Sequence, residues 1–172
     1  MTYTMTRMKK ILYLTLLVFL PFWQHSSHAQ SLTNAALTGI ESMGVVVNPI
    51  DPDLVRTDFS VDYFKTQLEV ELRKAGIKVT DHTTLAETTG RPYLELTIHA
   101  VKVALNMYSY HLELKLMQHV QLRREPNMIL STITWTRTQL GNQNRSKFHE
   151  LNKDIQFMTN QFINDYFTVN PK

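Results

Sequence analysis

The sequence predicts an α+β fold, a two-layer sandwich with the element order β-α-β-β-β-β-α. Apolar residues recur at spacings of three and four over 61–75 and again over 148–166, which is the period of an amphipathic helix. Between these segments, residues 94–138 hold three long runs that alternate apolar and polar residues, the period of strands with one buried face. We therefore expect a mixed sheet with a long antiparallel meander and both helices on one face.

The first strand and helix are predicted from residues 43–79. Residues 43–47 form a β-branched run that suits a buried strand, and prolines follow it in residues 48–53. Ser60 is a suitable N-cap for the first helix, and Gly76 stands where a left-handed C-cap is needed. Residues 77–79 form a second strand, which predicts a βαβ unit with a parallel pair.

The first long strand changes its apolar phase part-way. Apolar residues stand at even positions up to Ile98 and at odd positions from Val101 onward. A one-residue β-bulge near Ala100 explains the change, because two residues there would oppose one partner. With a tight turn at 106–107, this bulge predicts three cross-strand pairs: Val101 with Leu112, Ile98 with Leu114, and His99 with Glu113.

The other segments follow from the same patterns. Residues 81–91 and 140–147 are polar and are expected to be loops. In the last strand we expect Ile129, Ile133 and Trp135 to face inward.

Residues 1–29 have the composition of a secretory signal peptide. Three basic residues precede an apolar run over 11–22, and small residues precede an expected cleavage between Ala29 and Gln30. We expect export to the periplasm or the extracellular space, with no stable membrane insertion after cleavage. Residues 30–38 would form a flexible leader and 39–172 a single α+β domain.

Charge and cysteine content restrict the function. The chain has a formal charge of +3, and its signal segment holds three basic residues and no acidic one. The exported part is therefore neutral, which argues against nucleic acid as a partner. The absence of cysteine excludes disulfides, thiol catalysis, cysteine metal sites and lipid anchoring through an N-terminal cysteine.

The sequence also lacks reaction-specific motifs. No serine lies in a G-x-S-x-G elbow, and the five glycines do not form a phosphate-binding cluster. We therefore predict no catalytic residue, no cofactor and no enzymatic activity.

Three residues on the expected outer face of the sheet form a candidate metal site. His99, His111 and Glu113 would lie near one another in the expected register and could bind zinc. A solvated sheet face with ordinary cross-strand polar pairs explains the same residues. Because they lack the i, i+4 spacing of a helical metal motif, we predict no metal ligand.

Aromatic residues supply two functional hypotheses. Phe157, Phe162, Tyr166 and Phe167 occupy more than one face of the last helix and are a candidate interaction surface. We expect a non-enzymatic envelope accessory protein that contacts a protein partner through this helix or through a sheet edge. The alternative is a soluble carrier of a small apolar ligand. Its pocket would be lined by aromatic residues: Tyr108, Tyr110, Trp135, Phe162 and Tyr166.

Two stretches, Glu71–Val79 and Gln161–Lys172, resemble a family of uncharacterised exported bacterial proteins. The predicted topology is similar to small envelope modules such as the N-terminal domain of TolB and the lipopolysaccharide-assembly lipoprotein LptE. The resemblance implies an envelope location and carries no catalytic residue across. The chain departs from LptE in lacking the lipid-bearing cysteine.

Overall fold

The computed structural model describes residues 34–55 and 59–172, so the predicted signal peptide and its cleavage between Ala29 and Gln30 lie outside the described residues. The predicted α+β class and element order are confirmed, with one added short α-helix and two short 3₁₀ helices. The elements are β1 (Ser42–Val47), η2 (Pro52–Leu54), α3 (Val61–Ala75), β2 (Lys78–Val79), α4 (His82–Glu87), β3 (Tyr93–Ala104), β4 (Met107–Leu122), β5 (Glu125–Asn144), η3 (Arg145–Glu150) and α5 (Leu151–Val169).

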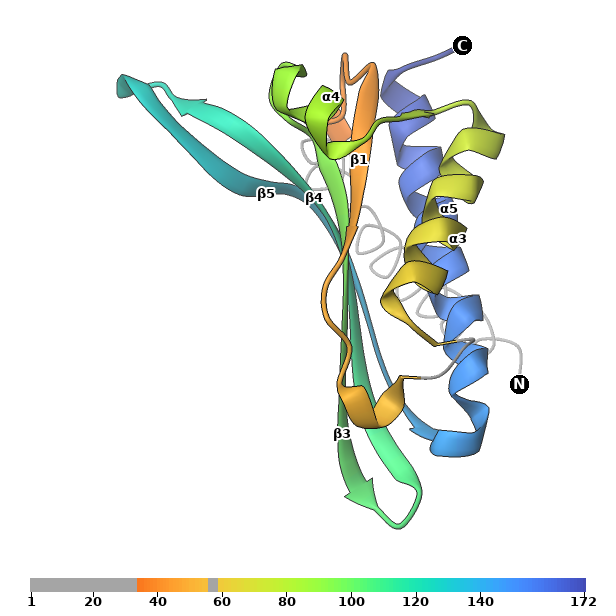
Figure 1. Ribbon diagram of the computed structural model, residues 1–172. Coiled ribbons are helices and arrows are strands. Elements are labelled where there is room, and N and C mark those ends of the chain that lie inside the picture. Colours follow the sequence, from red (N-terminus) through yellow and green to blue (C-terminus); the bar gives the residue numbers. More distant parts are fainter. Residues whose placement is uncertain (1–33, 56–58) are drawn as a thin grey trace, which may run out of the picture. The chain divides into compact units, whose positions relative to one another are not determined.

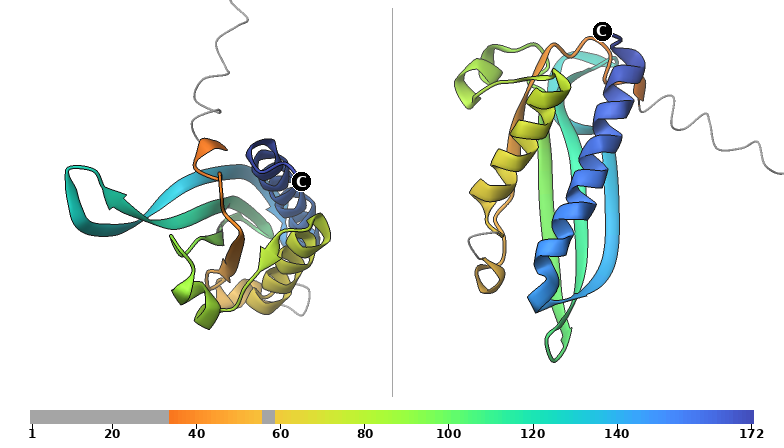
Figure 2. Two further views of the ribbon diagram at one scale, coloured as in Figure 1. Left: turned by 90° about the horizontal axis from the view of Figure 1, so that it is seen from above. Right: turned by 90° about the vertical axis from the view of Figure 1, so that its right-hand side faces the viewer.

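The sheet has the strand order β2-β1-β3-β4-β5. Strand β1 runs parallel to both β2 and β3, whereas β3, β4 and β5 form the antiparallel meander. Helix α3 lies over β1, and α5 lies over β4 and β5, on the same face of the sheet (Figure 1 and Figure 2). The predicted βαβ unit and the two-layer arrangement are therefore confirmed.

Helix α3 begins and ends where its capping residues predict. The Ser60 hydroxyl accepts a hydrogen bond from the Tyr63 N–H at 3.2 Å. Gly76 has φ 91°, a left-handed conformation that suits a residue without Cβ, and its N–H bonds the Arg73 carbonyl. The apolar stripe faces the sheet through Phe64, Leu68 and Leu72, which are all buried.

The bulge predicted near Ala100 is wrong. The β3–β4 ladder runs without interruption through Lys102, and its irregularity lies between Lys102 and Ala104. The observed pairs are Ile98 with Leu112, His99 with His111, and Val101 with Ser109. Val101, Val103 and Leu105 are 66%, 58% and 86% exposed. In this uninterrupted ladder Val101 and Val103 lie on the same outer face as His99, which neither helix covers, so the phase change needs no bulge (Figure 1).

The inward prediction for β5 holds only for Trp135, which is fully buried. Ile129 and Ile133 are 65% and 47% exposed. Trp135 pairs with Leu116 and Ile133 pairs with Met117, which leaves Thr134 as an extra residue at a bulge that reverses the strand face. Beyond Met117, strand β4 has no further pairing with β3, so the β4–β5 hairpin leaves the sheet (Figure 2).

Two predicted loops contain regular structure. Helix α4 occupies part of 81–91 because Asp81 is its N-cap, its carboxylate accepting from the Thr84 N–H at 2.8 Å. That backbone hydrogen bond is the main reason why the pKa of Asp81 lies below its usual value. Strand β5 continues to Asn144, through most of the loop predicted over 140–147.

The described end of the predicted leader packs against the domain. Leu37 is fully buried, and its carbonyl accepts from the Asn170 side chain at 2.9 Å. Asn34 donates to the Asp165 carboxylate at 3.2 Å. Residues 34–38 are therefore held against α5 and are not a flexible leader.

Helix α5 is anchored on β5 by a buried aromatic pair and a carboxylate. The Trp135 ring meets Phe162 edge-on with centroids 5.0 Å apart, and both residues are fully buried. The Asp165 carboxylate accepts from the Trp135 indole N–H at 2.9 Å and from Arg137 Nη2 at 2.8 Å. One carboxylate thus satisfies a buried donor and an ion-pair partner.

Tyr110 provides a second link between the sheet and α5. Its hydroxyl donates to the Asp154 carboxylate at 2.7 Å. Burial, followed by this hydrogen bond and the Asp154 charge, raises the pKa of Tyr110 to about 12. Gly141 stands opposite Tyr110 on β5, where a Cβ would lie 2.5 Å from the hydroxyl oxygen. Only glycine leaves room for the ring to cross β5.

Asp165→Ala should lower the free energy of unfolding by about 1–3 kcal/mol, since the buried Trp135 indole N–H loses its acceptor. Asp165→Asn should cost less, because its amide oxygen can still accept from the indole. Urea unfolding followed by Trp135 fluorescence measures both variants. Equal stability of Asp165→Ala and wild type would contradict the anchoring role.

The Tyr110 phenol should contribute to stability in a pH-dependent way. Its pKa in the folded protein, about 12, lies above the ordinary value of 10.0. Its stabilisation is therefore complete below pH ~10 and is lost as the pH rises from ~10 to ~12. The stability difference between wild type and Tyr110→Phe, from urea unfolding at several alkaline pH values, should shrink over this range. A constant difference would contradict the assignment.

Candidate functional site: the open edge of β1

Of the four aromatic residues predicted to form an interaction surface on the last helix, two are buried and two are accessible. Phe162 is fully buried and Tyr166 is 8% exposed, so their assignment to an accessible surface is wrong. Phe157 is 59% exposed, as expected for a surface residue. Phe167 is half-buried, with its ring 5.1 Å from Tyr166 and Lys172 Nζ 4.8 Å from its centroid. The four residues do not form one exposed patch because the helix turns two of them into the core.

The aromatic residues of the carrier hypothesis pack on other core groups. Trp135 and Phe162 contact each other, and Tyr108 lies 5.2 Å from Phe148 in an edge-on arrangement. The Tyr166 hydroxyl donates to the Ile40 carbonyl at 2.5 Å. These rings are core contacts and are not the walls of a ligand cavity.

The histidines of the outer sheet face pair with each other. His99 lies opposite His111, and their rings are parallel within 5° with centroids 6.3 Å apart. Glu113 lies opposite Thr97, and its carboxylate accepts from Lys115 Nζ at 3.2 Å. Within residues 34–55 and 59–172, no group of three or more His, Asp or Glu residues could hold a metal ion.

A charged network covers the same outer face above the histidines. Lys115 Nζ lies 3.1 Å from Glu95 and 3.2 Å from Glu113, and all three side chains are at most 25% exposed. Asn48 donates to Glu95 at 2.9 Å and to Thr97 at 2.8 Å. Burial lowers the pKa of Lys115, but hydrogen bonds and charges from the two carboxylates outweigh it and leave the pKa raised. Both carboxylates are held by this lysine, which is a structural arrangement.

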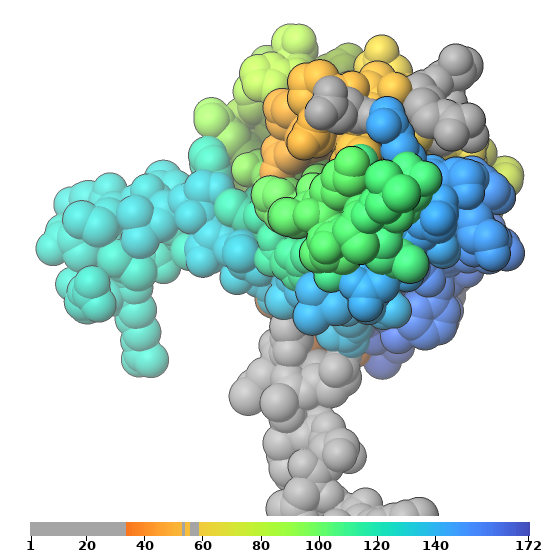
Figure 3. Space-filling view, turned by 90° about the horizontal axis from the view of Figure 1, so that it is seen from below, coloured from red at the N-terminus to blue at the C-terminus, as the bar shows by residue number. Residues whose placement is uncertain are grey.

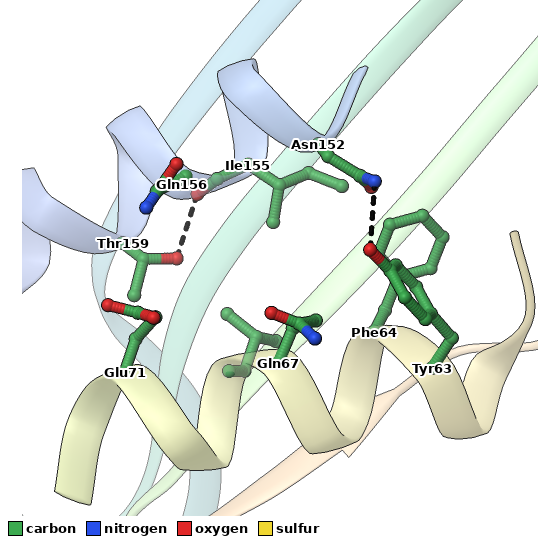
Figure 4. Close-up of a pocket in the computed structure, with 9 residues that line it drawn as sticks. Tyr63, Phe64, Gln67, Glu71, Asn152, Ile155, Gln156 and Thr159 are labelled. Carbon is green, nitrogen blue, oxygen red and sulfur yellow. Dashed lines mark hydrogen bonds between the residues drawn. The ribbon is translucent and has the colours of Figure 1, made fainter. Parts of the chain in front are cut away.

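A cleft of about 210 Å³ lies between α3 and α5 (Figure 4). At one end Asn152 donates to the Tyr63 hydroxyl at 3.1 Å, and at the other Thr159 donates to the Ile155 carbonyl at 2.8 Å. Glu71 is the titratable acid in its lining, and it forms an ion pair with Lys74 at 2.9 Å. The cleft therefore offers little chemistry for a reaction or for a charged ligand.

The more informative opening is a slot beside β1, where β2 ends. Strand β2 pairs only with Ser42 and Met43, and the Thr80 N–H closes this ladder on the Met43 carbonyl at 2.9 Å. On the other side, the Gly44 N–H bonds the Pro92 carbonyl just before β3, and the Asn48 N–H bonds the Leu96 carbonyl of β3, at 2.9 Å each. In a parallel ladder, each residue directs its N–H and C=O to the same side, and successive residues alternate between the two sides. Val45, which lines the slot, therefore directs its backbone groups into it.

Helices α3 and α4 form the walls of this slot, whose volume is about 310 Å³. Lys65, Glu69 and Arg73 stand one turn apart along α3 and line one wall, with Glu69 and Arg73 paired at 3.0 Å. Leu85 of α4 lies on the other side, where a Cβ on Gly44 would come within 2.8 Å of it. The slot is the space that a longer β2 would fill.

A second hollow of about 340 Å³ opens on the outer face beside the same edge. It shares Val46, His82 and Leu85 with the slot and adds Tyr93 and Arg91. The free edge of β1 is therefore accessible from both faces of the sheet.

The other edge strand carries features that hinder strand pairing. Arg137 Nη1 donates to the Thr136 carbonyl at 3.1 Å, and the bulge at Thr134 interrupts the regular edge of β5. Edge charges and bulges are the usual protection against addition of another strand. Strand β1, Ser42–Val47, has no charged side chain.

Sequence reasoning did not find this slot. A weak signal existed, because the β-branched run over 43–47 is longer than the run over 77–79. Two paired strands of unequal length leave part of one edge open. The charged residues at 65, 69 and 73 are one helical turn apart, but such a stripe is also typical of a solvated helix face.

No protein-family model matches this sequence, and no curated protein matches it significantly. Among solved structures, it is similar to a minor lipoprotein from Acinetobacter baumannii, with 13% identity and a TM-score of 0.30. The match covers 72% of this chain and 90% of that chain. This level of similarity assigns neither a family nor a function. Within the part of the chain that the structure describes, no helix is long and apolar enough to span a membrane.

Lys115→Met should lower the free energy of unfolding by about 1–3 kcal/mol, because two partly buried carboxylates lose their shared cation. Glu113→Gln should cost less, since Glu95 still pairs with the lysine. Urea unfolding at neutral pH measures both. If Lys115→Met were as stable as wild type, the network would contribute no net stability.

Proposed function

We propose that this chain is a non-enzymatic accessory protein of the bacterial envelope that binds an extended segment of another envelope protein. The binding site is the free edge of β1, and the mode is strand addition. The single observation that carries the proposal is the walled slot into which Val45 directs its backbone groups. The signal-peptide pattern of residues 1–29 supports a site of action in the periplasm or outside the cell.

The geometry of the slot limits the length of the bound segment. The part of β1 that lines the slot, from Gly44 to Val46, comprises three residues, or ~10 Å of strand. Backbone hydrogen bonds would supply affinity, and the two walls would select alternate side chains, because neighbouring residues of a strand face opposite sides.

The walls favour a particular sequence pattern. On the α3 side, Lys65 and Arg73 contribute two positive charges against one from Glu69. On the other side Leu85 and Val46 are apolar, with Val46 38% exposed, and Asp81 and His82 line the end of the slot. The segment that fits alternates acidic side chains toward α3 with apolar side chains toward α4.

The alternative, a soluble carrier of a small apolar ligand, has less support. Its aromatic residues pack within the core, and the α3–α5 cleft has a mixed lining that includes Gln67, Glu71 and Gln156.

A photo-crosslinking amino acid at position 65 should capture an envelope protein in intact cells, because Lys65 lines the slot. The matched control is position 66, which is equally exposed on α3 and does not line the slot. We expect an adduct at 65 and none at 66, and loss of the adduct when Arg73→Glu makes the α3 wall acidic. The same adduct at both positions, or none at 65, would contradict strand addition at β1.

A further inference from the structure

The distal β4–β5 hairpin, residues 118–132, is here called the hairpin arm. The last β3–β4 pair at this end joins Tyr93 to Met117, so beyond it the two strands of the arm pair only with each other. Figure 1 and Figure 2 show the arm leaving the sheet away from both helices, and Figure 3 shows it in teal standing clear of the body. The base of the arm is held by the body, because Gln118 donates to the Ala36 carbonyl at 3.0 Å and the His119 N–H donates to the Gly90 carbonyl at 2.7 Å. Toward the tip, Met128, Ile129 and Leu130 are exposed.

The tip of the arm exposes aliphatic side chains on both faces. Met128, Ile129 and Leu130 are consecutive and are 46%, 65% and 43% exposed. Because successive strand residues face opposite sides, Ile129 and Leu130 place apolar groups on the two faces of the hairpin. Leu130 pairs with Val120, which widens the apolar area on its face. A flat protein surface would cover one face, whereas immersion in a soft interface covers both.

The same tip concentrates positive charge. Arg123 and Arg124 are adjacent, exposed and located at the turn between the two strands. Glu125 is the single acidic residue between positions 118 and 132. The exported chain is formally neutral as a whole, so this cluster is a local concentration of charge. Arginines beside aliphatic groups are complementary to anionic headgroups above an acyl layer.

We propose that the tip of the hairpin arm docks reversibly on the surface of an anionic phospholipid bilayer. The arginines contact headgroup phosphates, and Met128, Ile129 and Leu130 enter the headgroup–acyl boundary. The strand edges of the arm stay at headgroup depth, where water satisfies their backbone groups. Two basic residues and three aliphatic ones give weak binding, so attachment is peripheral and salt-sensitive. This site is separate from the β1 slot, and it would hold a bound partner segment near a membrane.

The test is vesicle flotation of the exported, processed protein at low and high salt. The vesicles contain phosphatidylglycerol with phosphatidylethanolamine, or phosphatidylcholine alone. Wild type should float with the anionic vesicles at low salt and remain unbound with phosphatidylcholine. Arg123→Glu with Arg124→Glu should lower partitioning at least ~tenfold, since each basic residue near the surface contributes to binding.

Matched controls separate the arm from general charge and apolarity. Lys147→Glu with Lys153→Glu makes the same charge change at exposed positions outside the arm. Ile129→Ser with Leu130→Ser should abolish partitioning, whereas Val101→Ser with Val103→Ser removes equally exposed aliphatics at the β3–β4 turn and should not. All these side chains are exposed, so circular dichroism should show each variant folded.

The depth of the arm in the bilayer can be measured with a dye on a single introduced cysteine, because the chain has no cysteine of its own. An environment-sensitive dye on Met128→Cys should shift its emission to the blue on anionic vesicles, and the same dye on Val103→Cys should not. No flotation of wild type, or flotation unaffected by the arm variants, would overturn the proposal. Capture of a protein partner by the arm without vesicle binding would also overturn it and assign the arm to a protein contact. Crosslinking at position 65 is read independently, so each proposal can fail alone.

Discussion

The fold depends on how α5 is fixed to the meander. Trp135 and Phe162 fill the space between β5 and the helix, and removing either large ring from such a core typically costs about 3–5 kcal/mol. Apolar packing alone would let the helix slide or rotate. The Asp165 carboxylate removes that freedom because it accepts from both the Trp135 indole and Arg137. It also receives the Asn34 side chain, so the start of the described chain is tied to the same point.

The length of the helices sets where the sheet has a core. Under α3 and α5 the inward residues of β3 and β4 are fully or nearly fully buried, as at Leu94, Leu96 and Leu114. The strands continue beyond the helices at both ends, toward the β3–β4 turn and into the hairpin arm. Val101 and Val103 are exposed because they lie on the outer face, and Ile129 and Leu130 are exposed because the arm projects beyond the helices. The apolar residues in these parts of the strands therefore do not mark buried positions.

The two sides of the sheet differ in how accessible their unpaired strand edges are. Strand β5 is interrupted by a bulge and has Arg137 bonded to a backbone carbonyl, both of which hinder pairing. Strand β1 is longer than its neighbour β2, and its remaining edge is recessed between α3 and α4.

The sequence by itself determined the class of fold, the element order, the parallel βαβ start and the helix α3 with both of its caps. These features depend on residues that are close together in the sequence. The apolar periodicity predicts each element, and Ser60 and Gly76 mark the two ends of α3. Tertiary structure decided the bulge positions, the burial of Phe162 and Tyr166, the pairing of His99 with His111 and the slot beside β1. Each of these depends on which residues lie opposite one another across strands and layers. Apolar alternation has the same appearance in a covered strand and in a projecting one, so only the extent of the helix layer distinguishes Leu94 from Ile129.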